Sequence, residues 1–296
     1  MTDGGIRWVM GTSATIIVSG GSTSATADAF VELEALEAIW SRFRPSSELC
    51  RLNQAAGRIT VVSRALYSLI EHLESARRLT GGRFDPTLHD RMIELGYDRT
   101  YRELVDSGRR AVMPFTHAAD AGEIVLLPTA SAVLLPDGVH IDPGGLGKGL
   151  GGDLVARSVM DSGARGVMID IGGDIVTRGL APDGGPWRIE IPRAGRHPAQ
   201  IVELTDGAVA TSDTSVRTWT SGSLRRHHVL DPDSGLPLTH DVEATVIAGA
   251  GWWAEAMATA VMVSAARHDY WFDARLDQQL GVTAFVTVLE SESAHA

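Results

Sequence analysis

The chain contains a glycine-rich stretch that neither a regular strand nor a regular helix explains, IDPGGLGKGLGGD at Ile141–Asp153. Six of its thirteen residues are glycine, and glycine loses more backbone entropy on folding than any other residue. A shorter motif, IDIGGD, follows at Ile169–Asp174. Glycines let backbone N–H groups approach a bulky anion, a following helix adds positive potential, and Lys148 adds a full charge. The stretch therefore predicts a site for a phosphate-bearing ligand at the start of a helix.

The stretch differs from the common nucleotide-binding motifs. It lacks the GxxxxGK[ST] spacing of a Walker loop, and no strand runs directly into a GxGxxG motif here as the Rossmann fingerprint requires. The second motif, Ile169–Asp174, is compatible with a ligand loop or with a tight exit from a strand. A phosphate ligand is therefore predicted without either of the usual nucleotide folds.

Composition places the chain among globular proteins and limits its partners. Its 296 residues are 44% hydrophobic and 21% charged, enough for one large domain or two small ones. The net charge of −11 argues against a nucleic acid as partner, because that binding relies on lysine and arginine. The single cysteine, Cys50, excludes a disulfide within the chain and a thiolate metal cluster.

The chain shows no signal for a membrane. It has no apolar run of about 18 residues, so we expect no membrane insertion. The segment Met1–Val18 is interrupted by small and polar residues and is not followed by a lipid-attachment cysteine. We read no signal peptide and expect a cytoplasmic protein.

Hydrophobic periodicity predicts five helices. They span Ala25–Phe43, a short segment capped by Ser46 or Ser47 and running through Asn53, Ser63–Thr80, Gly149–Ser162 and Trp252–Ala266. Strands are expected at Trp8–Val18, with a bulge or a close approach of a ligand at Gly11, and at 124–128, 132–135, 166–171, 187–191, 200–204, 241–248 and 282–289. Residues 99–122 lack periodicity and are expected to be an irregular connection. Because strands and helices do not alternate regularly, the order favours an α+β fold.

Eight ordered motifs together resemble the ApbE-like FAD:protein FMN transferases, and the resemblance covers nearly the whole chain. The motifs are Met10–Thr12, Phe43–Asn53 (FRPSSELCRLN), Gly82–Thr87 (GRFDPT), Ile141–Gly149, Ile169–Gly173, Ala210–Ser212, His228–Gly235 (HVLDPDSG) and Ala254–Ala260 (AEAMATA). The resemblance implies an ApbE-like α+β fold, in which a mixed or antiparallel sheet is flanked by helices and two lobes enclose the FAD site. It also implies a single domain over residues 1–289, and we expect residues 290–296 to form a disordered tail.

The resemblance also implies an activity. Such an enzyme uses Mg²⁺, takes FAD as substrate, and transfers FMN to a Ser or Thr hydroxyl of an acceptor protein with release of AMP. The acceptor is expected to be a redox protein that carries the Ser/Thr segment. The residues agree with this chemistry, because attack on a pyrophosphate needs its negative charge neutralised by a hard cation.

By the same resemblance, the metal site falls on the main-chain carbonyl of Gly145 and the side chains of Glu255 and Thr259. Glu255 and Thr259 are four residues apart on an expected helix, so they share a face. Relatives usually have Asp at the position of Glu255, which is one methylene longer. The alternative for Glu255 is a partly exposed helical glutamate.

The residues expected to bind FAD come from several motifs. Lys148 matches the family lysine beside the flavin nucleotide, and Asp142 matches an FAD-binding carboxylate. The remaining positions that match the FAD site are Met10, Phe43, Arg83, Phe84, Asp85 and, through its backbone, Leu230. For Met10 and Phe43, core packing is the alternative.

His228 is the predicted catalytic residue, because it matches the family histidine in HxxDP. Histidine titrates near neutral pH and can take the proton of an acceptor hydroxyl or orient a phosphate. Adjacent residues of a strand face opposite sides, so we expect its neighbour His227 to face solvent.

The sequence is also compatible with two other functions. One is an ApbE-like protein that binds FAD or FMN without transferring it, with Glu255 marking a lost metal site. The other is an FAD pyrophosphatase that uses water as acceptor and gives FMN and AMP.

Overall fold

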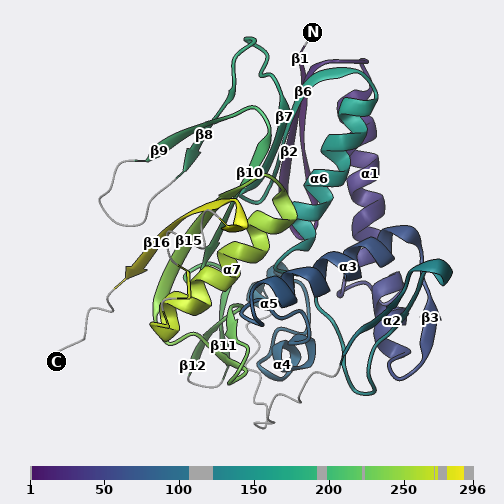
Figure 1. Ribbon diagram of the computed structural model, residues 1–296, viewed down its shortest axis with the longest axis vertical. Helices are drawn as coiled ribbons and strands as arrows, with labels where there is room; N and C mark the ends of the chain where they lie inside the picture. The colour runs from purple at the N-terminus through teal and green to yellow at the C-terminus, as the bar shows by residue number, and fades with distance from the viewer. Residues whose placement is uncertain are drawn as a thin grey trace.

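The structure, a computed structural model, describes residues 2–106, 123–191, 199–221, 224–269, 271–272 and 279–289. Its largest element is a seven-stranded sheet in the order β1-β2-β6-β7-β10-β15-β16, with antiparallel neighbours throughout (Figure 1). The strands are β1 (Thr2–Val9), β2 (Thr12–Gly20), β6 (Ala164–Ile171), β7 (Asp174–Gly179), β10 (Gly207–Asp213), β15 (Asp241–Ala248) and β16 (Val282–Leu289). The predicted α+β class with an antiparallel core is confirmed.

Two tight turns lie side by side at one end of this sheet. Met10 and Gly11 have φ angles of 53° and 72° and join β1 to β2, as a two-residue hairpin requires. The prediction of one bulged strand over Trp8–Val18 is therefore wrong, because the chain reverses at Gly11. Gly172 and Gly173, with φ of 66° and 95°, join β6 to β7, and the N–H of Gly172 donates to the carbonyl of Ser13 at 3.0 Å. The second glycine motif is thus a strand exit.

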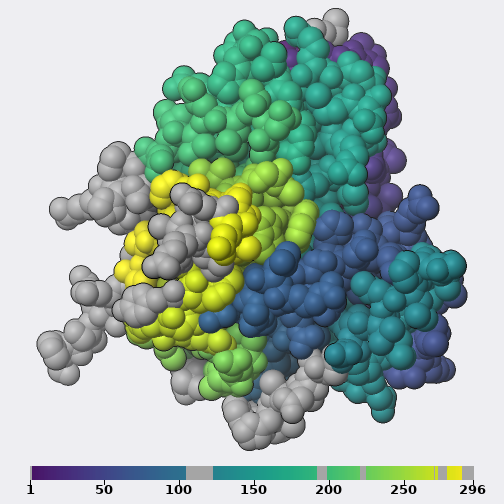
Figure 2. Space-filling model, in the orientation of Figure 1, coloured from purple at the N-terminus to yellow at the C-terminus, as the bar shows by residue number. Residues whose placement is uncertain are grey.

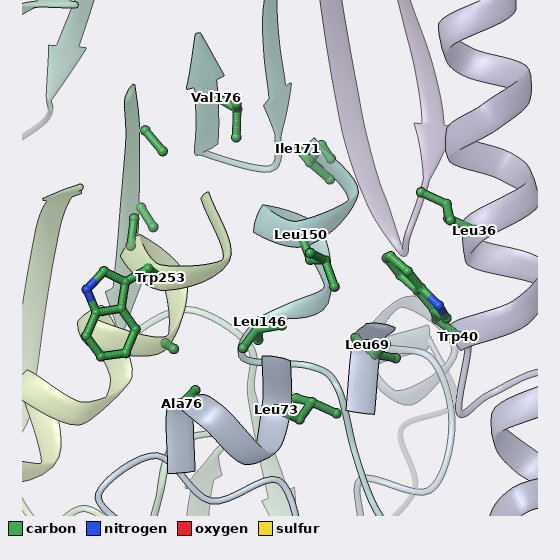
Figure 3. Close-up of a cluster of buried hydrophobic side chains, with 14 of the residues drawn as sticks. Leu36, Trp40, Leu69, Leu73, Ala76, Leu146, Leu150, Ile171, Val176 and Trp253 are labelled. Atoms are coloured by element: carbon green, nitrogen blue, oxygen red, sulfur yellow. The ribbon is translucent and has the colours of Figure 1, made fainter. Parts of the chain in front are cut away.

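Three long helices cover one face of the sheet and a fourth packs below them. They are α1 (Ala25–Trp40), α6 (Gly147–Asp161), α7 (Gly251–Arg267) and, as the fourth, α3 (Arg64–Leu79), which packs on α1 and α7. Figure 3 shows side chains of these helices meeting those of β6 and β7 in the main core. Leu146 and Leu150 are buried in this core. Core packing therefore holds the C-terminal part of the glycine stretch, while its N-terminal part stays accessible.

The helix predictions are confirmed, with ends shifted by a few residues. The helix predicted to reach Phe43 ends at Trp40, because Ser41 is extended with φ −68° and ψ 122°. Ser47 caps α2 (Glu48–Gln54) by accepting the Cys50 N–H at 3.0 Å. The helix of the glycine stretch begins at Gly147, two residues earlier than predicted.

Short elements surround this frame. They are β3 (Ile59–Val61), β4 (Val125–Leu127), η1 (Pro128–Ala130) and β5 (Ala132–Leu134) beside α2, the hairpin of β8 (Trp187–Ile191) and β9 (Gln200–Leu204), and the pairs β11 (Thr218–Ser221) with β12 (Leu224–His227) and β13 (Leu230–Asp231) with β14 (Leu236–Pro237). The β8–β9 hairpin packs its apolar side chains on Val209 of β10. In Figure 2, the blue helical region lies against the yellow-green C-terminal region.

A second, smaller core lies apart from the main one. It joins α4 (His89–Glu94) and α5 (Tyr101–Asp106) to the β11–β14 region. Its buried residues are Met92, Leu95, Tyr97, Leu104, Trp219 and Leu230. The predicted irregular connection over 99–122 is wrong at α5, and residues 107–122 lie outside the described residues. The expected division into two lobes stays a prediction.

Two further expectations concern the chain as a whole. The expected tail, residues 290–296, lies outside the described residues, and the single domain stays a prediction. Among the residues that the structure describes, no helix is both long and apolar enough to cross a membrane.

A contact between two glycines fixes how α6 and α7 meet. A Cβ built on Gly149 would lie 2.2 Å from the carbonyl oxygen of Gly251, and one built on Gly251 would lie 2.6 Å from that of Gly149. Neither position tolerates a side chain unless the backbones separate. The first turns of the two helices are therefore in direct backbone contact.

This contact predicts a loss of stability for Gly149→Ala. The added methyl group would meet backbone rather than a flexible side chain, so the free energy of unfolding should fall by about 1–3 kcal/mol. Urea denaturation measures it. Gly147→Ala is the matched control, because its Cβ meets only Pro143 Cβ at 3.5 Å. Equal stabilities of the two variants would contradict the tight crossing.

Candidate active site

A cavity of about 850 Å³ lies between the sheet and the second core. Small-molecule sites commonly measure about 300–1,000 Å³. Its walls come from both hairpin turns, the end of α1, residues of the 83–102 segment, the glycine stretch, β8, β10, the 213–232 region and α7. Segments from the whole length of the chain thus meet around one space large enough for a dinucleotide.

All twelve residues predicted for the site line this cavity. They are Met10, Phe43, Arg83, Phe84, Asp85, Asp142, Gly145, Lys148, His228, Leu230, Glu255 and Thr259. Their individual roles stay predictions.

Lys148 lies at the centre of a buried charge cluster. Its Nζ is 2.8 Å from Asp174 Oδ2 and forms a second ion pair with Glu255 Oε1. The other carboxylate oxygen of Glu255 accepts the Gly149 N–H at 2.8 Å. Only 3% of the Glu255 side chain is exposed, so a partly exposed helical glutamate is excluded. One positive and two negative groups give the cluster a net charge of −1.

The cluster shifts the pKa of its members. Burial lowers the pKa of Lys148, but attraction to Asp174 and Glu255 outweighs burial and raises that pKa overall. Burial raises the pKa of Glu255, and Lys148 opposes this shift. Lys148 balances only one of the two negative charges of Asp174 and Glu255, so these carboxylates favour the binding of a second cation.

Two further oxygen donors lie near Glu255. A Cβ built on Gly145 would be 3.5 Å from Thr259 Oγ1, so the backbone of the glycine stretch passes close to α7. Thr259 is one turn beyond Glu255 on the same helix face. A carboxylate, a hydroxyl and a main-chain carbonyl are the hard oxygen donors that Mg²⁺ takes. The residues predicted for the metal therefore fit such an ion.

Asp142 is held by an arginine that the sequence did not single out. Arg42 Nε lies 2.9 Å from Asp142 Oδ2, and the Asp142 N–H donates to the Pro86 carbonyl at 2.8 Å. The Arg42 guanidinium stacks 4.1 Å from the Phe43 ring centroid and 4.6 Å from that of Tyr97. The predicted Phe43 is thus part of a cation–π cluster in the cavity wall.

The segment Arg83–Asp85 is bound to the surrounding protein. Arg83 pairs with Asp269 at 2.8 Å and stacks 4.7 Å from the Trp271 ring centroid. Asp85 accepts the Thr87 N–H at 2.8 Å and its hydroxyl at 2.6 Å. Phe84 is 3% exposed. These contacts hold the shape of the cavity wall, which is compatible with the predicted role in lining the FAD site.

Met10 and Leu230 lie on opposite walls. Met10 reaches across the turn to α6, where a Cβ on Gly151 would be 2.9 Å from its Cε atom. Leu230 belongs to the second core. Both residues pack and line the cavity, so the packing alternative for Met10 is compatible with its predicted role in the site.

His227 and His228 do not face opposite sides in the way that the alternation of a strand predicts. His228 lines the cavity, and its Nδ1 is buried with no hydrogen-bond partner among the described residues. His227 is buried too, with Nε2 3.0 Å from the Leu238 carbonyl oxygen. The prediction that His227 faces solvent is wrong, because β12 ends at His227 and the strand alternation stops there.

The environment of His228 keeps it neutral. Burial lowers its pKa to about 3, and the positive charges of Arg217 and Lys148 add to the effect. A neutral imidazole can accept a proton. His228 is therefore unprotonated in the cavity, and its low pKa makes it a weak base in this state.

Sequence reasoning missed two further charged residues of the cavity, Asp174 and Arg217. Asp174 ends the second glycine motif, so its pairing with Lys148 had a local signal. Arg217 lines the cavity with a left-handed backbone, φ 54°. A non-glycine residue held there stores strain of about 1–3 kcal/mol, as functional sites often do.

The charge cluster predicts a pH-dependent loss of stability for Lys148→Met. Without the ammonium, Asp174 and Glu255 would face each other in a buried site, which should cost about 3–5 kcal/mol of unfolding free energy near pH 8. A carboxyl whose folded pKa is raised binds a proton more readily folded than unfolded, so the loss should shrink as the pH falls toward 5. Urea denaturation at both pH values measures it.

The double variant Lys148→Met/Glu255→Gln is the control. It removes the repulsion together with the cation, so it should recover part of the lost stability. Wild-type stability of Lys148→Met at pH 8 would contradict the cluster.

The family comparisons agree with this geometry. The family model described as the ApbE family matches residues 10–283. A protein of Vibrio cholerae named FAD:protein FMN transferase is 29% identical over 242 residues, which cover 78% of this chain and 70% of the relative. A protein of the same name from Treponema pallidum is 28% identical over 257 residues, covering 81% and 71%.

Solved structures show the same fold. The crystal structure of the ApbE protein of Thermotoga maritima superposes with a TM-score of 0.81 at 23% identity, covering 97% of this chain and 94% of that one. The apo form of the flavinyl transferase ApbE of Pseudomonas stutzeri gives 0.77 at 23% identity, covering 98% and 92%. The chain therefore belongs to the ApbE family, as its sequence motifs predicted.

Proposed function

We propose that this chain transfers FMN from FAD to a Ser or Thr hydroxyl of an acceptor protein and releases AMP, with Mg²⁺ as cofactor. The name of the curated relatives, FAD:protein FMN transferase, supports flavin transfer. The observation that carries the proposal is the assembly of Lys148, Glu255, Thr259 and His228 around one cavity.

Positive side chains would hold the pyrophosphate of FAD. Lys148 and Arg217 both line the cavity, and both act electrostatically on His228. Preorganised cations are what phosphoryl transfer needs, since catalysis there rests on positioning and charge stabilisation. The backbone of the glycine stretch leaves room for the phosphates beside Lys148.

Glu255, Thr259 and the carbonyl of Gly145 would hold Mg²⁺. The ion would supply neutralisation of phosphate charge. Since Lys148 now pairs with Glu255, metal binding would free the ammonium from one of its two carboxylates. Lys148 could then turn toward the substrate while Asp174 retains it in the cavity.

His228 would take the proton of the acceptor hydroxyl. The hydroxyl oxygen forms a bond to the phosphorus of the FMN half, the bond from that phosphorus to the bridging oxygen breaks, and AMP leaves. The negative pyrophosphate offsets the charges of Arg217 and Lys148, so FAD binding should raise the pKa of His228 by the part that these charges lower it, while burial continues to hold it down. The imidazole would thus be a stronger base with substrate present.

An assay with FAD separates this function from its alternatives. The protein is incubated with FAD and Mg²⁺, with and without a flavoprotein subunit that carries a Ser/Thr acceptor segment. A mass increase of the acceptor by one FMN, with AMP released in equal amount, is the expected result. AMP and free FMN without acceptor would indicate a pyrophosphatase, and unchanged FAD would indicate a binding protein. The expected cytoplasmic location and the redox nature of the acceptor stay predictions.

Glu255→Gln should raise the Mg²⁺ concentration needed for half-maximal transfer by at least tenfold, because the variant loses one charged ligand of the ion. The affinity for FAD without metal should change little. Glu190→Gln is the control, since it removes an exposed carboxylate from the same cavity on β8. An unchanged Mg²⁺ requirement would overturn the metal assignment.

His228→Ala should lower kcat by about 10²–10⁴-fold, the range for loss of a general base. The Kd for FAD should stay within a few fold, because the imidazole acts on the acceptor. Added imidazole should restore part of the rate. Full kcat in the variant would exclude the catalytic role, and His240→Gln controls for the loss of an exposed histidine.

A further inference from the structure

We infer that His89, Asp90 and His140 form a second metal site, outside the flavin cavity, that takes a zinc-type divalent transition ion. The ligand atoms of the three side chains all lie within 4.8 Å of one another. None of the three lines the cavity. The site therefore shares no residue with the oxygen donors proposed for Mg²⁺.

Both imidazoles point the same nitrogen at one carboxylate. His89 Nδ1 lies 2.9 Å from Asp90 Oδ1, and His140 Nδ1 lies 2.8 Å from that oxygen and 2.7 Å from Oδ2. The rings meet edge to face with centroids 5.8 Å apart. Two nitrogen donors and one oxygen donor thus already face a common point.

Asp90 is kept in the charged form that a metal requires. The hydrogen bond from His89 lowers the pKa of Asp90, and His140 lowers it further against the opposing effect of burial. An ionised carboxylate accepts hydrogen bonds only, so each Nδ1 must carry a proton here. A metal ion would take the place of those two protons, and each neutral ring would then carry its proton on Nε2.

Small movements would convert the cluster to a coordination sphere. Zn²⁺ binds nitrogen and carboxylate oxygen at about 2.0–2.2 Å, so tetrahedral donors lie about 3.4 Å apart. Each imidazole nitrogen therefore needs to move roughly half an ångström away from the carboxylate oxygen that it now contacts. Imidazole nitrogens favour zinc, copper or nickel, whereas Mg²⁺ and Ca²⁺ favour oxygen.

The backbone around the cluster is fixed, and its side chains are open to entry. Asn53 donates to the Ile141 carbonyl and accepts the Ile141 N–H, both at 3.0 Å. His140 is thereby held in place directly before the glycine stretch. The side chains of His89, Asp90 and His140 are 13%, 49% and 31% exposed. An ion can enter from solvent, and water can complete three protein ligands.

The ion would act as a clamp. It would join the start of α4 to His140, which lies two residues before Asp142. Asp142 lines the flavin cavity. The same two segments are already linked where the Asp142 N–H donates to Pro86. The metal would thus fasten the glycine stretch to the start of α4, directly after the wall residues Arg83, Phe84, Asp85 and Leu88.

Zinc uptake by the full chain tests the inference. Metal-free protein is titrated with Zn²⁺ against a chromophoric chelator in excess Mg²⁺. We expect one tightly bound equivalent in the wild type and in Glu255→Gln. His140→Gln and the isosteric Asp90→Asn should lose it or bind at least tenfold more weakly, since even outer-shell partners of a metal are worth about 10–100-fold.

His240→Gln is the matched control, because it removes one ring of another histidine pair, with His268, whose centroids are 5.5 Å apart. It should keep the equivalent. Absence of tight zinc in the wild type, its retention in folded Asp90→Asn, or its loss in Glu255→Gln or His240→Gln would each overturn the site. The count of bound zinc is independent of flavin transfer, so this inference and the proposed function can fail separately.

Discussion

The backbone contact between Gly149 and Gly251 is the constraint on which the candidate site depends. It allows the first turns of α6 and α7 to touch, and that approach puts Lys148 against Glu255 and the Gly149 N–H in hydrogen-bond range of the same carboxylate. A larger side chain at Gly149 or Gly251 would push the two helices apart. It would thereby separate the buried Lys148 from Glu255. The glycines thus act through packing between helices as well as through room for a ligand.

The charges around the cavity form one coupled system. Lys148 is bound by two carboxylates, Arg42 by Asp142, and Arg83 by Asp269. Such pairs hold the walls in place while the cluster keeps a deficit of positive charge that a metal can fill. Burial and the charges of Arg217 and Lys148 keep His228 neutral, so the charge of the substrate can adjust the pKa of this base.

Much of this organisation could be predicted from the sequence, and the exceptions have physical causes. Motif order led to the family and to twelve residues that line the cavity, because each motif carries its own local signature. Arg42 was missed as a site residue because its partner Asp142 lies far away in the chain. Arg217 was missed because it lies outside the eight motifs, and Asp174 was missed although it ends the second glycine motif. The hairpin at Met10 was missed because a non-glycine residue at positive φ is uncommon. His227 was misplaced because alternation holds only while a strand continues.

The most direct test of the account is the position of a metal ion relative to Lys148 and Glu255. Anomalous diffraction from crystals grown with FAD and Mn²⁺, a substitute for Mg²⁺, would locate it. We expect a peak bounded by Glu255, Thr259 and the Gly145 carbonyl, with Lys148 turned from Glu255 toward the pyrophosphate. A peak elsewhere in the cavity, with the Lys148–Glu255 pair intact, would contradict it.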